Sequence, residues 1–349
     1  MKTKRPTLRD VAREANVSYQ TVSRVINDAP DVSAETRARV LAAIQELGYR
    51  RNRNATALVS NRSTLIGIIT DESRRYGPVG TLLALEAAAR RAGYGSTVVS
   101  VAEPYNVSVQ AAVDSLEDVG VDGVIVIAPR LALGTAVRKA SFRVPVEMIA
   151  AGASSTPHMF TYAENQELGA RLATQHLIDL GHTDIAHVAG SMDWYDGRVR
   201  KRGWKAALSR AGLPIGLCVE GDWSPGWAYR IALRLIDEGL PSAIFAASDH
   251  TALGIMRACL ENGVRVPDDV SIVGFDDIEG SDYFFPPLTT VRQDFPALAR
   301  RSIDLLLSSI EGRAVDHTPA PPILVVRDST AAPLHTVRSR RRRSRASSE

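Results

Sequence analysis

From residue 64 onward, short apolar runs rich in β-branched residues alternate with longer amphipathic stretches. The length of each run suits a strand that is buried on both faces. The seven runs cover 65–70, 97–101, 124–127, 146–149, 185–189, 243–247 and 271–275. The helical stretches between them include 80–92, 106–119, 167–180, 198–211, 226–239 and 252–262. This alternation predicts parallel sheets covered by helices, with ligands at the carboxyl ends of the strands. Roughly 270 residues exceed one such sheet, so we expect two α/β lobes with a cleft between them.

The first 48 residues follow a different period, with apolar side chains three and four positions apart. Thr7 is a suitable N-cap for a first helix, and Asp10 three residues later completes a capping box. Asn16 tolerates the left-handed backbone that a tight turn requires. Ser18 can then cap a second short helix, and a third follows. The pattern predicts an all-α helix-turn-helix head over residues 1–48.

Charge is distributed unevenly along the chain, although the formal net charge is only +3. Residues 1–62 contain 12 basic and 6 acidic residues, and residues 334–349 contain six arginines and one glutamate. The remaining residues carry a net charge of −8. A basic head on an acidic body indicates a polyanion such as nucleic acid as the partner of the head, with an ordinary solvated face as the alternative.

Several function classes are excluded by what the sequence lacks. No run of eighteen apolar residues is present, and no apolar stretch follows the charged N-terminus, so we expect a cytoplasmic protein. Two cysteines, Cys218 and Cys259, cannot form a disulfide framework or a four-cysteine zinc site. The phosphate-binding loop, the dinucleotide glycine fingerprint and the Gly-x-Ser-x-Gly motif are all absent. We therefore expect no enzyme, no catalytic residue, no metal and no cofactor.

The second helix of the predicted head carries polar residues at its exposed end. A glutamine there can pair with adenine and an arginine with guanine, whereas short hydroxyls suit phosphate contacts. A protein-interaction bundle with solvated polar residues is the alternative. The candidate DNA-binding residues on this helix are Ser18, Tyr19, Gln20, Thr21, Ser23 and Arg24.

The head is similar to that of the lactose-repressor (LacI/GalR) family of bacterial transcription regulators, in the run TLRDVAREANVSYQTVSRVIN (7–27). The similarity continues through VSAETRARVLAAIQELGYRRN (32–52) and into the body, where it includes EGDWS (220–224), ALGIMRA (252–258) and PPLTTVRQDF (286–295). The resemblance implies that Tyr19, Gln20 and Arg24 read base edges. It adds Thr7, Asn27 and Asn52 to the DNA-binding set.

The resemblance also implies a hinge helix over residues 49–63 that folds only on the operator. Ala55 and Leu58 would enter the minor groove, with Leu58 as an apolar wedge that bends the DNA. Packing of Leu58 on the body is the alternative. Because one helix-turn-helix covers a half-site, we expect a homodimer on a palindromic operator.

For the body, the resemblance implies the periplasmic sugar-binding fold, in which three segments cross between two lobes. We place the crossings near Tyr162, Val291 and Ile323, which assigns 64–162 and 292–322 to the first lobe and 163–291 and 323–333 to the second. Residues 334–349 form an Arg-rich segment that we expect to be disordered. This tail lacks the leucine heptads of a tetramer, so a dimer is the expected assembly.

The expected effector site lies in the cleft of this body. Trp223 offers a flat face for a pyranose, and charged side chains there give strong hydrogen bonds to hydroxyls. The residues concerned are Arg200, Trp223, Ser248, Asp249, Asp276, Gln293 and Phe295.

Three effector positions depart from the pattern that the chain most resembles. Ser248 replaces an Asn, the loop 71–76 is charged where the pattern is small and apolar, and Glu164-Asn165 replaces an Asp-containing pair. We therefore predict a repressor of a sugar-utilisation operon that a sugar, with a galactoside favoured, releases from DNA. A regulator that uses a purine or other corepressor and a plain sugar-binding protein are the alternatives.

Overall fold

The computed structural model describes residues 6–26, 29–49, 62–313 and 321–334. The chain forms two compact units, Met1–Ser63 and Thr64–Glu349. The predictions for Asn27, Asn52, Ala55 and Leu58, for the hinge helix and for the tail lie outside the described residues.

The head contains three helices, α1 (Leu8–Glu14), α2 (Tyr19–Ile26) and α3 (Ala34–Glu46). The predicted capping box is confirmed, because Thr7 and Asp10 each accept a hydrogen bond from the other's backbone N–H. The predicted left-handed residue at the tight turn is also confirmed, with φ 50° at Asn16. The three helices share a small core around Val11, Val22 and Val40, so the chain turns sharply between α1 and α2 and presents the N-terminal end of α2.

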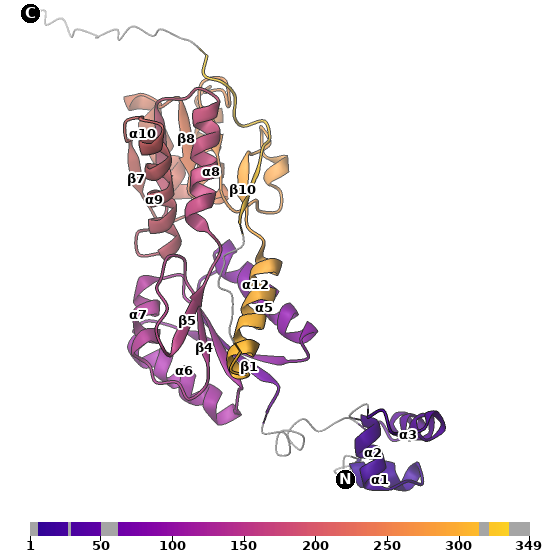
Figure 1. The fold of residues 1–349 in the computed structure, drawn as a ribbon. Helices are drawn as coiled ribbons and strands as arrows, with labels where there is room; N and C mark the ends of the chain where they lie inside the picture. The colour runs from indigo at the N-terminus through magenta and orange to yellow at the C-terminus, as the bar shows by residue number, and fades with distance from the viewer. Residues whose placement is uncertain (1–5, 27–28, 50–61, 314–320, 335–349) are drawn as a thin grey trace, which may run out of the picture. The chain divides into compact units, whose positions relative to one another are not determined.

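The first lobe of the body is built on a parallel sheet of order β2-β1-β3-β4-β5. Helices α6 and α7 cover one face of this sheet, while α5 and α12 cover the other (Figure 1). The strands are β1 (Leu65–Asp71), β2 (Gly95–Val101), β3 (Gly123–Ile127), β4 (Val146–Ile149) and β5 (Met159–Tyr162). The helices are α5 (Tyr76–Arg91), α6 (Tyr105–Val119), α7 (Leu131–Lys139) and α12 (Phe295–Ile310).

The second lobe has a four-stranded parallel sheet of order β7-β6-β8-β9. Helices α8 and α9 pack on one face, and α10 and α11 on the other. The strands are β6 (Ile185–Ala189), β7 (Cys218–Glu220), β8 (Ala243–Ala246) and β9 (Ser271–Val273). The helices are α8 (Gln166–Asp179), α9 (Tyr195–Arg210), α10 (Pro225–Glu238) and α11 (Asp249–Glu261), with a 3-10 turn, η1, at Ser281–Tyr283.

Three segments connect the lobes. The chain passes from β5 into α8, returns from β10 (Thr290–Arg292) into α12, and re-enters the second lobe through β11 (Ile323–Val325). Strands β10 and β11 pair antiparallel. The described structure is therefore an all-α head and an α/β body of two parallel-sheet lobes, which confirms the predicted fold class.

Three helices begin three or four residues earlier than the sequence predicts. Helix α5 starts at Tyr76 instead of residue 80, α9 at Tyr195 instead of 198, and α11 at Asp249 instead of 252. Proline is tolerated in a first helical turn because the N–H it lacks would have no partner there, and Pro78 lies in the first turn of α5. The early starts bring helix N-termini close to the strand ends, where the cleft lies. Helices α7 and α12 fall outside the predicted helical stretches.

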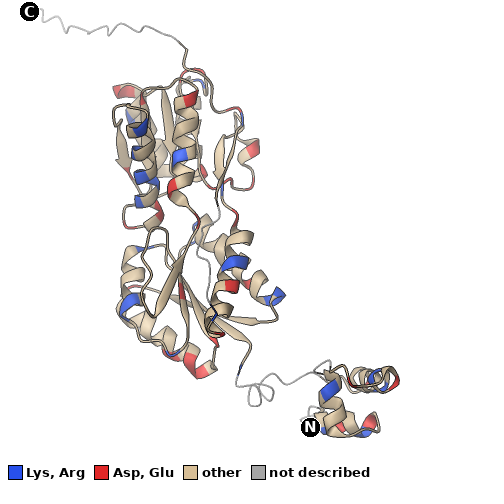
Figure 2. Ribbon diagram, viewed as in Figure 1, with Lys and Arg blue, Asp and Glu red and all other residues tan. Residues whose placement is uncertain are grey.

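Charged side chains of both signs are interspersed on the helices that flank the sheets (Figure 2). Within the described part of the chain, none of the helices has the length and apolar character needed to cross a bilayer. The same residues contain no cluster of three His, Cys, Asp or Glu side chains that could hold a metal ion.

Candidate functional site

A cleft of about 550 Å³, solvent at its open side included, lies between the two lobes of the body. The first lobe contributes the start of α5 and the two arginines before it. The second lobe contributes the residues that follow β6, β7, β8 and β9. The lining residues are Arg74, Arg75, Tyr76, Gly77, Pro78, Trp194, Asp196, Arg200, Trp223, Ser248, His250 and Asp276.

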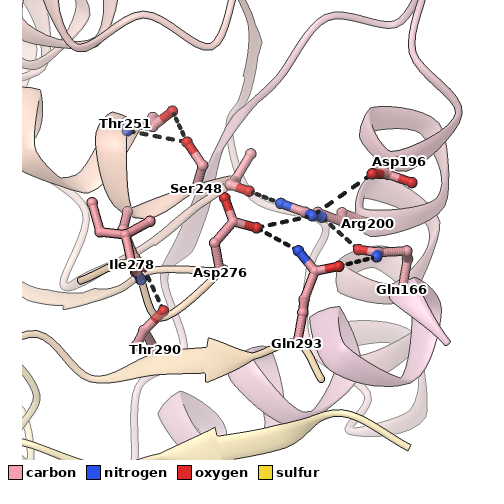
Figure 3. Close-up of polar contacts among 11 residues, drawn as sticks. Gln166, Asp196, Arg200, Ser248, Thr251, Asp276, Ile278, Thr290 and Gln293 are labelled. Atoms are coloured by element: carbon pink, nitrogen blue, oxygen red, sulfur yellow. Dashed lines mark hydrogen bonds and ion pairs between the residues drawn. The ribbon is translucent and has the colours of Figure 1, made fainter. Parts of the chain in front are cut away.

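Arg200 of α9 is fixed at the floor of the cleft, with only 3% of its surface exposed. Its Nε donates to Gln166 Oε1 at 2.9 Å, and its Nη2 donates to Asp276 Oδ1 at 3.2 Å. A third bond goes to the Ala247 carbonyl, at the end of β8. The guanidinium carbon lies 3.7 Å from the centroid of the Phe275 ring, close enough for a cation–π contact. Figure 3 shows this network converging on one guanidinium.

Asp276 follows β9 and is buried beside Arg200. Its Oδ1 also accepts a bond of 2.7 Å from Gln293 Nε2, whereas Oδ2 accepts none from the described residues. Its φ of 113° is a conformation that side chains rarely adopt, and such strain clusters at ligand sites. Burial raises the pKa of Asp276 to about 6, although Arg200 opposes the shift. At neutral pH, Asp276 is thus mostly an ionised acceptor with one oxygen available to a hydroxyl.

Trp223 lines the cleft beside this carboxylate and carries a left-handed backbone, φ 67°. Two glycines, Gly190 and Gly197, leave the space its ring occupies, since a Cβ at either position would collide with neighbouring atoms. The indole N–H is buried without a hydrogen-bond partner in the described structure. A buried donor without a partner destabilises the site, and a hydrogen bond from this N–H to a ligand oxygen would remove that cost.

Trp194 is a second aromatic side chain in the cleft that the sequence analysis missed. Its ring centroid lies 5.7 Å from that of Trp223, with the planes inclined by 55°. This geometry is an edge-to-face contact, so the two rings pack on each other and do not form a slot for a third ring. The sequence analysis also omitted Asp196 and His250, and it included Tyr76 only as part of the loop 71–76. All four residues lie at the starts of helices that the sequence analysis began three or four residues too late.

Two of the predicted effector residues have internal partners. Asp249 is fully buried and does not line the cleft, because Thr290 Oγ1 and the Ile278 N–H donate to its two oxygens. Burial and the charge of Asp276 raise its pKa to about 8. Ser248 lines the cleft, but its Oγ caps α11 by accepting a bond of 3.2 Å from the Thr251 N–H.

Gln293 and Phe295 lie in an adjoining chamber of about 450 Å³, which shares Gly77, Pro78 and Asp196 with the cleft. One half of the chamber is apolar, from residues 127–129 and 149–151. Glu164 faces it with 5% exposure and no hydrogen bond to either carboxylate oxygen among the described residues. Burial raises the pKa of Glu164 to about 8, so this side chain is mainly protonated at neutral pH. The predicted effector residues therefore line two adjoining spaces, except for Asp249, which is buried and lines neither of them.

In the head, the exposed face of α2 contains Tyr19, Gln20 and Arg24, with 52% of Tyr19 exposed. Arg24 makes a surface ion pair of 3.1 Å with Asp31, which has little energetic weight and can open. The hydroxyls assigned to phosphate are engaged locally. Ser18 Oγ accepts from the Thr21 N–H at 3.0 Å and also bonds to Thr21 Oγ1, while Thr7 forms its capping box. Ser23, in the middle of α2, is half-buried.

Two family models match the chain. Residues 7–52 match the model described as bacterial regulatory proteins, lacI family, and residues 174–330 match the periplasmic binding protein-like domain. The lactose operon repressor of Escherichia coli (strain K12) is 40% identical over 331 residues, 94% of this chain and 91% of that protein. The HTH-type transcriptional repressor PurR of Pasteurella multocida (strain Pm70) is 33% identical over 94% of this chain and 99% of its own length. The crystal structure of the Lac repressor dimer bound to operator and the anti-inducer ONPF superposes with a TM-score of 0.81 and 38% identity, covering 94% of this chain and 100% of that one.

Proposed function

The chain belongs to the lacI family of bacterial regulatory proteins and is a DNA-binding transcriptional repressor; we propose that it represses a sugar-utilisation operon and that a sugar bound in the cleft releases it from its operator. The site of action is then the cytoplasm, where the DNA is. A galactoside is the first candidate, because the lactose operon repressor is 40% identical over nearly the whole chain.

One observation carries the sugar assignment: an aromatic ring and a buried, pre-oriented charge pair face the same cleft. The apolar face of a pyranose can stack on Trp223, while its hydroxyls donate to Asp276 Oδ2. Arg200 is held by Gln166 and Asp276 before any ligand arrives, so little ordering is required on binding. Charged groups in such a site bond hydroxyls more strongly than neutral groups do.

DNA recognition in this proposal is assigned to Tyr19, Gln20 and Arg24 on α2, which are exposed where a recognition helix reads base edges. A homodimer places two such helices on the half-sites of a palindrome. Support for a dimer comes from the Lac repressor structure, which is a dimer on its operator.

Release follows from linkage between the cleft and the head. A sugar that binds one arrangement of the lobes more tightly shifts the population toward it, and DNA must weaken sugar binding by the same factor. The lobes are in contact across the cleft in this structure. The Leu131 N–H donates to the Asp193 carbonyl at 2.8 Å, and the Tyr195 N–H donates to the Pro129 carbonyl at 3.0 Å. These contacts are the ones that a change in lobe orientation would rearrange.

The test is fluorescence anisotropy of labelled DNA from upstream of this gene, titrated with protein and then with a panel of sugars. Tight binding that one sugar reverses is the expected result. Tight binding that no sugar of the panel reverses contradicts the sugar assignment. Binding that stays weak and salt-sensitive on every upstream fragment contradicts a local operator.

The role of the head is tested with Gln20→Ala, which removes the only amide on the exposed face of α2. Operator discrimination at one base pair should fall by about 1–3 kcal/mol, with little change in non-specific affinity. Gln45→Ala, on the exposed side of α3, is the matched control. Unchanged specificity in Gln20→Ala would remove this residue from the reading set.

A flat heterocyclic corepressor, such as a purine, is the second candidate, because the cleft contains a second tryptophan, Trp194. The edge-to-face packing of the two indoles favours the sugar. The same titration distinguishes the candidates by sign: a sugar inducer lowers the affinity for DNA, whereas a corepressor raises it.

A further inference from the structure

The mouth of the cleft has cationic side chains that the sugar site does not use. Arg74, Arg75 and His250 line the same space as Trp223. Arg75 Nη2 donates to the Asp222 carbonyl at 2.7 Å and its Nη1 to the Trp223 carbonyl at 3.3 Å, across the cleft. Backbone carbonyls have no net charge, and three of the five guanidinium N–H groups are left over. The positive charge of Arg75 is therefore not neutralised by these bonds.

Neither the side chain of Arg74 nor that of His250 has a hydrogen bond or an ion pair with any residue in the described parts of the chain. Arg74 is exposed and His250 is half-buried. The pKa of His250 is lowered by burial and then by the positive charge of Arg75. The lowered pKa keeps His250 neutral at neutral pH, so the positive charge at this end of the cleft is that of Arg74 and Arg75.

The acidic residues of the cleft are engaged elsewhere. Asp276 lies 3.2 Å and Asp196 3.9 Å from the third arginine, Arg200, at the floor. Burial raises the pKa of both carboxyls, although at a pKa of about 6 Asp276 is still mostly ionised at neutral pH. These two carboxylates face Arg200, and within the described residues neither forms an ion pair with Arg74 or Arg75. The acidic neighbour of Arg75 is Asp222, whose pKa is lowered by hydrogen bonds from Ser224 and also by the charge of Arg75, but the two side chains form no ion pair in the described structure.

The backbone adds to this polarity, because the first turn of α5, a helix of 16 residues, lines the cleft beside the arginines. No side chain caps this helix. The N-terminal end of a helix has a partial positive charge and free N–H groups. The N-terminal end of α5 and the two guanidinium groups therefore line the same side of the cleft.

From this arrangement we propose that the effector is an anionic sugar, whose ring stacks on Trp223 while its carboxylate or phosphate group binds Arg74 and Arg75. This inference rests on the proposed function and specifies its ligand class. A planar guanidinium binds either anion through paired N–H groups, so the two anions are separated by experiment.

The test is isothermal titration calorimetry of the full chain with matched sugars: galactose, galacturonate and galactose 6-phosphate, then glucose, glucuronate and glucose 6-phosphate. One anionic member should bind at least about tenfold more tightly than its neutral parent, as a charge-assisted hydrogen bond predicts. Its affinity should also fall with added salt, which screens an exposed pair. A gain for the uronate alone identifies a carboxylate, and a gain for the 6-phosphate alone identifies a phosphate.

Arg74→Gln removes the positive charge and keeps a polar side chain at this position. Because Arg74 is exposed, we expect the variant to fold normally. The variant should lose the advantage of the anionic sugar, about tenfold, and keep the affinity for the neutral parent. Arg91→Gln, at the far end of α5, is the matched control. Neutral sugars that bind as tightly as their anionic derivatives overturn the inference but leave the sugar-responsive repressor standing. A panel in which none of the six sugars binds overturns both proposals.

Discussion

The two lobes of the body contribute to the cleft in different ways. The second lobe provides side chains that are already bonded to each other, from Gln166 through Arg200 to Asp276, and Gln293 from the segment that crosses into the first lobe donates to Asp276. The first lobe provides one segment, residues 74–78, whose arginines make no ion pair within the described structure. The second lobe therefore pre-forms a binding surface, and the first lobe closes over it and adds charge.

The cores of the lobes differ as well, because a carboxylic acid is completely buried beside the sheet of the first lobe and a histidine beside the sheet of the second. In the first lobe, Glu147 of β4 is completely buried beneath α12, and neither carboxylate oxygen has a partner in the described structure. The hydroxyl of Ser302 lowers its pKa slightly but lies outside hydrogen-bond geometry. Desolvation dominates and raises the pKa of Glu147 to about 8.

In the second lobe, His187 of β6 is completely buried. Its Nδ1 lies 2.9 Å from the Phe245 carbonyl, and its ring stacks on Phe245 with centroids 4.6 Å apart. Desolvation lowers the pKa of His187 to about 4. Both groups are thus neutral at pH 7, and the lobes should respond to pH in opposite directions.

The largest predicted effect concerns Glu147. Its folded pKa of about 8 exceeds the ordinary value of 4.5, so the folded state holds a proton that the unfolded chain has lost. Stability should fall as pH rises from about 4.5 to 8, by about 5 kcal/mol in this window. Glu147→Gln mimics the protonated acid and should reduce the decline by this amount, while Glu164 and Asp249, whose pKa values are also raised to about 8, keep their own contributions. Urea unfolding at pH 5 and pH 8 measures it, with the exposed Glu103→Gln as control. An unchanged pH slope would mean that Glu147 titrates normally.

The next effect has the opposite sign. His187 has a folded pKa of about 4, below the ordinary 6.5, so folding loses stability as pH falls from about 6.5 to 4, by about 3 kcal/mol. His187→Gln keeps a donor for the Phe245 carbonyl and should reduce this acid sensitivity. The acid sensitivity of His187→Gln is compared with that of His158→Gln, a variant at an exposed histidine. The carboxylates titrate in the same way in both variants, so their contribution cancels in the comparison. Equal acid sensitivity in the two variants would contradict the proposed neutral His187.

The head could be predicted from the sequence in more detail than the cleft, because its determinants are local. The capping box of Thr7 and Asp10 and the turn at Asn16 depend on residues within four positions of each other. The fold class of the body was equally accessible, since strands and helices alternate visibly. The cleft is assembled from residues far apart in the chain, such as Arg75 and Trp223.

Particular residues show the same physical cause. Asp249 is predicted to contact effector, and Thr290, 41 positions away in the chain, donates to one of its oxygens in this structure. Trp194 was missed because its place in the cleft depends on where α9 begins and on its packing against Trp223. The residues next to Glu147 in the sequence do not show that its side chain packs against α12, which lies more than 140 positions later in the chain. Local chemistry predicts caps and turns, whereas tertiary pairing decides which polar group stays available.

For the second lobe, Asp276→Asn tests the pre-formed surface. The variant keeps the shape of the side chain but loses the anionic acceptor and the ion pair with Arg200, so affinity for the inducing sugar should fall about 100-fold. Binding to operator DNA should stay unchanged, which leaves a repressor that cannot be induced. Asp237→Asn, an exposed aspartate of α10, is the control. A variant with normal induction would show that the ligand does not contact this carboxylate.

The smallest predicted effect concerns the first lobe. The Arg130 guanidinium lies 5.4 Å from the centroid of the Trp194 ring in the second lobe, and its Nε pairs with Asp71 at 3.3 Å. Arg130→Lys keeps a charge near Asp71 but loses the planar contact with the indole, which is worth about 0.5–1 kcal/mol at a partly exposed site. Affinity for the inducing sugar should therefore fall only about threefold. Calorimetry against Arg91→Lys measures this change. A loss as large as that of Asp276→Asn would mean that the first lobe forms the binding surface as much as the second does, and the asymmetry between the lobes would not hold.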